Sequence, residues 1–241
     1  MEYLRHLSGA FVLAGLIATA GCQPAGPVPA SPPPQADLAY DQPEGAEIIV
    51  LDTGLATDVF AEGAQVEKLT DDLFGWSEGP VWIRDGGYLL FTDVPGNTIH
   101  KWSEDAGLET FLQPSGLVGE DTEGVFREPG ANGLIPGDMP GTILLADHGN
   151  RAIARLDLET KEKTFLATRF DGKRFSSPND LVLAEGGAIY FTDPPYGLRE
   201  LDASPFRETV FNGVYLWRPD EDGGSVRVID DSLTRPNGIV R

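Results

Sequence analysis

The sequence predicts an all-β protein built from four-stranded propeller blades. A β-type run that ends in aspartate occurs three times, and its aspartates, Asp93, Asp147 and Asp193, lie 54 and 46 residues apart. A polar turn precedes each run, and these turns recur at intervals of 54, 47 and 58 residues. Repeats of about 40–50 residues made of short strands are typical of propeller blades. The 29 glycines and 19 prolines, with no convincing amphipathic helix after Ile48, favour many short strands joined by tight turns.

The N-terminus has the pattern of an export signal. Leu7–Gly21 is uncharged and follows Arg5, as in a signal-peptide core, and it is too short for a membrane-spanning helix. It ends in Thr19-Ala20-Gly21-Cys22, which resembles a bacterial lipoprotein signal. That resemblance implies that Cys22, the only cysteine, is lipidated and becomes the first residue of the mature protein. The alternative is a plain secretory signal with an incidental cysteine.

A proline-rich segment separates this signal from the predicted fold. Gln23–Pro43 holds seven prolines, and proline-rich chains stay extended and do not pack a core. We therefore expect a signal peptide at 1–21, a tether at 22–46 and an incomplete propeller at 47–241. The expected location is the periplasm or cell envelope, with membrane contact only through the lipid anchor.

The formal net charge of −20, from 38 acidic and 18 basic residues, argues against nucleic acid as a partner. Binding to nucleic acid depends on a cationic surface that displaces counterions. An acidic chain is compatible with a cation site or with solubility alone.

The stretch Trp76–Trp82 places Glu78 between two tryptophans, just before a strand predicted to begin at Val81. Taken alone, an acidic residue before a strand is usually a solvated loop charge. The run from Gly75 to Gly79 also matches the G-x-S-x-G nucleophile elbow, which needs a strand before its serine and a helix after it. Pro80 and a β-type run follow instead, so Ser77 is not assigned as a nucleophile. The other predicted strands are Tyr88–Phe91, Thr98–Trp102, Ile143–Asp147, Ala152–Asp157, Ile189–Asp193 and Gly213–Trp217.

Four polar turns carry the predicted site. These leading turns are Glu78-Gly79-Pro80, Ala131-Asn132-Gly133, Pro178-Asn179-Asp180 and Pro236-Asn237-Gly238. Equivalent positions of successive blades point to the propeller axis, so Glu78 and the three asparagines are expected to converge. One carboxylate with several amide oxygens suits Ca²⁺ or another hard divalent ion and suits Zn²⁺ poorly. Each asparagine alone has a local alternative, because asparagine tolerates left-handed turn conformations, but four polar residues in register favour a shared site.

At these residues the chain resembles the SMP-30/gluconolactonase/luciferin-regenerating-enzyme (LRE) family of six-bladed β-propellers, in its bacterial gluconolactonase-like branch. The resemblance runs from about Leu69 to the last residue. The matching stretches are Ser77–Trp82, Asp147–Arg151, Gly172–Asp180, Ile189–Gly197 and Arg235–Gly238.

The resemblance implies a metal-dependent hydrolase of lactones with one axial divalent cation, foremost Ca²⁺, with Mg²⁺, Mn²⁺ or Zn²⁺ as alternatives. It implies Glu78, Asn179 and Asn237 as metal ligands, and Asn132, His148 and Asn179 as substrate-binding residues. The vertebrate members have an arginine where this chain has Ser177, so a sugar-acid preference does not follow.

The family's remaining ligand is an aspartate in a Gly-x-Pro-Asp-Gly-like run, which is also its proposed general base. No such run precedes Arg241, so no catalytic residue is assigned in this chain. We expect the chain to be a fragment with about four blades of a six-bladed parent. The alternatives are an esterase or phosphotriesterase on the same scaffold, or a non-catalytic, surface-tethered propeller with a structural Ca²⁺. The sequence predicts no oligomeric state.

Overall fold

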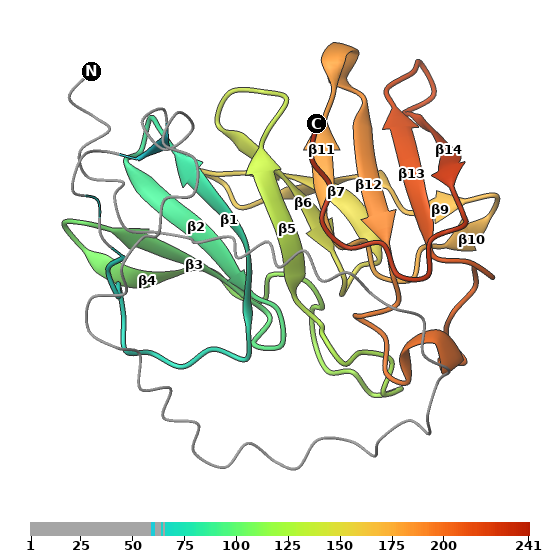
Figure 1. The fold of residues 1–241 in the computed structure, drawn as a ribbon, viewed down its shortest axis with the longest axis horizontal. Coiled ribbons are helices and arrows are strands. Elements are labelled where there is room, and N and C mark those ends of the chain that lie inside the picture. The colour runs from blue at the N-terminus through green and yellow to red at the C-terminus, as the bar shows by residue number, and fades with distance from the viewer. Residues whose placement is uncertain (1–58, 61–63, 65) are drawn as a thin grey trace. The chain divides into compact units, whose positions relative to one another are not determined.

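The chain has an all-β fold over the residues that its computed structural model describes, which are 59–60, 64 and 66–241 (Figure 1). It divides into two units, Met1–Asp71 and Asp72–Arg241, and every described strand belongs to the second unit. The predicted signal at 1–21, Cys22, the tether at 22–46 and the predicted start of the domain at residue 47 lie outside the described residues. No helix among the described residues is long and apolar enough to cross a membrane.

Three four-stranded antiparallel sheets form three consecutive blades, each with its strands in chain order (Figure 1). The first holds β1 (Ser77–Ile83), β2 (Tyr88–Asp93), β3 (Thr98–Ser103) and β4 (Gly107–Leu112). The second holds β5 (Ala131–Pro136), β6 (Thr142–Asp147), β7 (Ala152–Asp157) and β8 (Lys163–Ala167). The third holds β11 (Leu181–Leu183), β12 (Ile189–Asp193), β13 (Gly213–Arg218) and β14 (Ser225–Asp230). A two-stranded sheet, β9 (Arg169–Phe170) and β10 (Lys173–Arg174), precedes the third blade, and 3₁₀ turns occupy Glu185–Gly187 and Leu201–Ala203.

The all-β blade prediction is confirmed, with one difference at the leading turns. The first strand of the first blade begins at Ser77 rather than at Val81, because Glu78 pairs with Thr92 before the register shifts. The register shifts again in β5, between Ala131 and Leu134. The first two leading turns are therefore bulges inside strands, and a bulge redirects the side chains that it carries. The fourth leading turn, at Asn237, lies in no strand.

The core consists of two apolar layers, one between each pair of neighbouring blades. Side chains alternate along the middle blade, so that Ile143 and Leu145 face the first blade while Leu144 and Ile153 face the third. All four are fully buried. Period-two alternation thus gives the middle blade two buried faces, as stacked propeller blades require.

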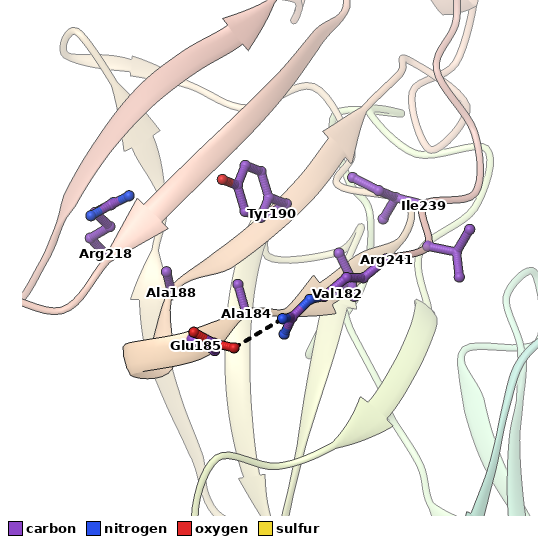
Figure 2. A pocket seen from close by; sticks show the side chains of 9 residues that line it. Val182, Ala184, Glu185, Ala188, Tyr190, Arg218, Ile239 and Arg241 are labelled. Carbon is purple, nitrogen blue, oxygen red and sulfur yellow. Dashed lines mark hydrogen bonds and ion pairs between the residues drawn. The ribbon is translucent and has the colours of Figure 1, made fainter.

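The outer face of the third blade carries a groove of about 520 Å³ (Figure 2). Val182 and Tyr190 line it, while their strand neighbours Leu181 and Phe191 pack into the core on the other side. At one edge, Arg241 forms an ion pair of 3.1 Å with Glu185 (Figure 2). None of the predicted site residues lines the groove, so we do not assign it as the functional site.

The repeated aspartates at the ends of the second strands anchor the neighbouring loops. Asp93 accepts a backbone hydrogen bond from Gly96, and Asp147 accepts one from Asn150 at 2.9 Å. Asp193 accepts two, from the backbone N–H groups of Ser176 and Ser177, each at 2.8 Å. The repeated aspartates therefore have a structural role, which is to hold loops by hydrogen bonds.

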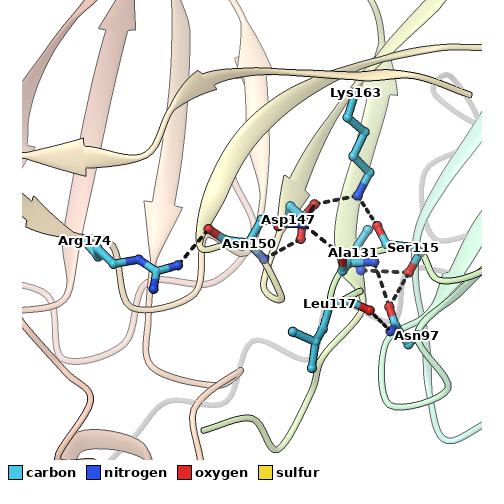
Figure 3. A network of polar contacts seen from close by, with 9 residues as sticks. Asn97, Ser115, Leu117, Ala131, Asp147, Asn150, Lys163 and Arg174 are labelled. Atoms are coloured by element: carbon cyan, nitrogen blue, oxygen red, sulfur yellow. Dashed lines mark hydrogen bonds and ion pairs between the residues drawn. The ribbon is translucent and has the colours of Figure 1, made fainter. Parts of the chain in front are cut away.

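Asp147 is also the centre of a polar network between the first two blades (Figure 3). The Nζ atom of Lys163 lies 2.6 Å from Asp147 Oδ2 and also donates to the carbonyl of Ser115. The hydroxyl of Ser115 accepts the backbone N–H of Ala131, the residue before Asn132. The network therefore connects the end of β6 to the start of the second leading turn.

Candidate functional site

Glu78, Asn132 and Asn179 occupy equivalent positions in the three blades. In each blade, the residue four positions after Glu78, Asn132 or Asn179 pairs with the residue four positions before the repeated aspartate of that blade. These pairs are Trp82 with Leu89, Pro136 with Ile143, and Leu183 with Ile189. The expected equivalence of the first three leading turns is therefore present in the strand register.

The four leading turns contact one another in sequence order. Gly79 has a φ of +51°, and a Cβ there would lie 2.4 Å from the carbonyl oxygen of Asn132, so only glycine fits. The N–H of Gly133 donates to the carbonyl of Asn179 at 2.9 Å. The N–H of Ile239, beside the fourth turn, donates to Asp180 Oδ2 at 2.8 Å. The polar residues on these turns are thus held around one region.

The electrostatics of this region favour a cation. The side chain of Glu78 is exposed, yet its pKa lies above the usual value, first because of partial desolvation and then because of the negative charges of Glu128 and Asp180. A positive charge on His148 would act in the opposite direction. Carboxylates that repel one another are stabilised when a cation lies among them.

Two asparagine amides are available to a ligand. Asn132 is 4% exposed and Asn179 is 3% exposed, and neither side chain makes a hydrogen bond to any residue that the structure describes. Nearly buried amides normally have partners, so both are suited to bind an external group. Asn237 differs, because it is exposed and its Oδ1 accepts the N–H of Gly238 in its own turn at 2.8 Å.

The donor set fits a hard divalent cation rather than a zinc site. Over residues 59–60, 64 and 66–241, no three His, Cys, Asp or Glu side chains are grouped as metal ligands. The Glu78 carboxylate and the amide oxygens of Asn179 and Asn237 instead offer oxygen ligands only, which Ca²⁺ accepts. Ser77, the rejected nucleophile, begins β1 and pairs with Asp93, so it does not stand between a strand and a helix.

Comparison with known proteins identifies the family. The family model for the SMP-30/gluconolactonase/LRE-like region matches residues 76–240, which include all four leading turns. The chain belongs to this family.

Several of the proteins that this chain is similar to are gluconolactonases. The chain is 47% identical to a gluconolactonase from Zymomonas mobilis over 174 residues, which are 72% of this chain and 48% of that protein. A solved structure of a gluconolactonase from Xanthomonas campestris is 31% identical, with a TM-score of 0.53 over 68% of this chain and 49% of its own. An X-ray structure of a candidate gluconolactonase is 29% identical, with a TM-score of 0.58 over 71% of this chain and 54% of its own. The chain therefore spans about half the length of the relatives that it matches.

His148 is buried more deeply than is usual for a residue that contacts substrate. It is fully buried, and neither ring nitrogen makes a hydrogen bond within the described part of the chain. Its Nδ1 lies 3.4 Å from Glu128 Oε2 but outside hydrogen-bond geometry. Gly197 covers the ring, since a Cβ at that position would lie 2.8 Å from Nδ1. His148 therefore exposes no surface at which a substrate could bind in this arrangement.

Glu128 and Asp180 were not predicted as site residues from the sequence. Asp180 directly follows Asn179, so its position in the leading turn was a usable signal. Glu128 stands four residues before Asn132 in an irregular segment, where no local pattern marks it. Only the packing of blades shows that both carboxylates act on Glu78.

A buried acid makes the stability of this family member depend on pH. Burial raises the pKa of Asp193 to about 7, although the N–H groups of Ser176 and Ser177 and the charges of Arg151 and Arg207 oppose the shift. Between the ordinary aspartate pKa and about 7, the folded state retains a proton that the unfolded state has lost, so stability falls as pH rises through this window. We expect the free energy of unfolding to drop by about 2–3 kcal/mol between about pH 5 and pH 8.

Urea denaturation across this pH range measures the effect. Asp193→Asn lowers stability at every pH, because its amide NH₂ faces a backbone donor, but it removes the titration. The variant should therefore show a shallower decline than the wild type. Identical pH profiles for the two proteins would contradict this assignment.

Proposed function

We propose that this propeller belongs to a metal-dependent hydrolase of lactones. The observation that carries the proposal is the contact between the neighbouring turns that carry Glu78, Asn132 and Asn179, together with two asparagine amides that have no hydrogen-bond partner among the described residues. The names of the relatives support the reaction class, since the Zymomonas mobilis and Xanthomonas campestris proteins are gluconolactonases.

The residues of this chain would bind and orient. Glu78, Asn179 and Asn237 would hold one divalent cation, most simply Ca²⁺, and the exposed Asn237 turn would release its internal hydrogen bond to do so. When bound, such an ion polarises a lactone carbonyl and stabilises the oxyanion. Asn132 and Asn179 would donate amide hydrogen bonds to the substrate. His148, assigned to substrate binding, would act from a buried position beside Glu128.

Activation of the attacking water is assigned to no residue of this chain. In the proposal, that step belongs to the aspartate that the family carries in a later blade. The chain contributes the carboxylate and amides that fix the reacting carbonyl, and precise placement by itself lowers the barrier.

Metal removal tests the proposal on the complete protein. Dialysis against EDTA should abolish hydrolysis of glucono-δ-lactone, and added Ca²⁺ should restore it. If EDTA lowers only the melting temperature and turnover continues, the ion is structural. If the protein cleaves aryl esters or phosphotriesters but no lactone, the reaction class is wrong and the scaffold assignment stands.

A further inference from the structure

An arginine and a tryptophan form an exposed pair beside the leading turns. Trp76 stands two residues before Glu78 and keeps 38% of its surface exposed. The guanidinium of Arg127 lies over its ring, with Cζ 5.2 Å from the ring centroid. Such a pair places the N–H donors of the guanidinium next to the flat apolar surface of the indole.

The position of Arg127 is set on two sides. Its Nη2 lies 3.4 Å from Oε1 of Glu128, a carboxylate whose side chain is only 4% exposed. Its backbone N–H donates to the carbonyl of Gly197 at 2.9 Å, and Gly197 packs on His148 and on Ser177. The guanidinium is therefore oriented before any ligand arrives, which reduces the entropy cost of binding.

Apart from the ion pair with Glu128, the donors of this guanidinium have no partner within the described part of the chain. The side chain of Arg127 makes no hydrogen bond to a described residue and is 45% exposed. A guanidinium presents five N–H donors in a planar fork, which suits adjacent oxygens on a ligand. Glu128, its ion-pair partner, is one of two carboxylates whose negative charges act on Glu78, so a negatively charged ligand near these carboxylates needs a positive charge beside them.

We propose that Arg127 and Trp76 determine specificity for polyhydroxylated lactones and bind the carboxylate product. The C–H face of the ligand ring packs on the part of the Trp76 indole that Arg127 leaves exposed, while vicinal hydroxyls or the product carboxylate accept hydrogen bonds from Arg127. Glu128 is a positioning residue that holds Arg127. This inference rests on the proposed function, because it names the substrate class of that same site.

Two lactones that differ in their hydroxyl groups test the pair on the complete protein. Arg127→Met should raise KM for glucono-δ-lactone about tenfold, as expected for a lost charge-assisted hydrogen bond, with little change in kcat. KM for δ-valerolactone, which has no hydroxyl groups, should stay unchanged. Arg127→Lys should show an intermediate effect, because an ammonium keeps the charge but not the planar fork. Arg84→Met, at the exposed turn after β1, is the matched control and should change neither constant.

A binding measurement separates failure of this inference from failure of the proposed function. D-gluconate should change the tryptophan fluorescence of the wild type; Arg127→Met should remove that response, and Arg127→Lys should weaken it. If the wild type hydrolyses lactones while Arg127→Met alters both lactones equally or neither, the specificity role is wrong. If no lactone is hydrolysed, the proposed function is wrong. If the variants keep the wild-type response to gluconate, the proposed binding role of Arg127 and Trp76 is wrong as well.

Discussion

Replacing Glu78 by glutamine should lower lactone hydrolysis by the complete protein at least about 100-fold. Loss of several kcal/mol of transition-state stabilisation corresponds to such a factor. Glutamine keeps the shape of the side chain but removes its negative charge, and a hard divalent cation depends on carboxylate ligands. Calcium titration followed by calorimetry should show the loss of binding directly.

The same variant should not lose stability without metal. The pKa of Glu78 is raised by partial desolvation and by Glu128 and Asp180, which means that the folded state disfavours its charge. A neutral side chain removes that penalty, so the metal-free melting temperature should stay the same or rise. Glu104→Gln, in the exposed turn between β3 and β4, is the control and should retain full activity. Full activity in Glu78→Gln would refute the assignment of this residue.

Replacing Lys163 by methionine should destabilise the chain by about 3–5 kcal/mol, the usual result of removing one partner of a buried ion pair. The carboxylate of Asp147 is fully buried, and Lys163 lies 2.6 Å from it with 14% of its side chain exposed (Figure 3). Asn150 still donates two hydrogen bonds to Asp147 in the variant, so the loss is expected toward the lower end of that range. Urea denaturation of wild type and variant measures the difference.

Lys101→Met is the matched control for this prediction. Lys101 pairs with Glu109 at 3.2 Å, but the two side chains are 30% and 49% exposed, and pairs that solvent reaches contribute at most about 1 kcal/mol. The double variant Lys163→Met with Asp147→Asn should regain part of the lost stability, because the unpaired charge is gone. Equal effects of the two lysine substitutions would show that burial of Asp147 does not decide the energetics.

Local patterns in the sequence determined the blade repeat. The β-runs that end at Asp93, Asp147 and Asp193 are strands, because alternation and turn chemistry act over neighbouring residues. The equivalence of Glu78, Asn132 and Asn179 followed from the same repeat, since one period relates all three. The start of β1 was placed late because a bulge interrupts its alternation at Gly79, and a bulge has no simple periodic signal.

The surroundings of Glu78 were decided only by tertiary structure. Glu128 and Asp180 act on it from the second and third blades, and Arg127 reaches Trp76 from an irregular segment. Arg127 and Glu128 are distant from Glu78 in sequence and share no period with it, so no local rule relates them. Asp180 lies in a leading turn, but the repeat alone does not show that its charge acts on Glu78. Blade packing brings them together, and the resulting desolvation and nearby charges raise the pKa of Glu78. The sequence by itself therefore determined the framework and the donor types, while the fold decided which charges those donors face.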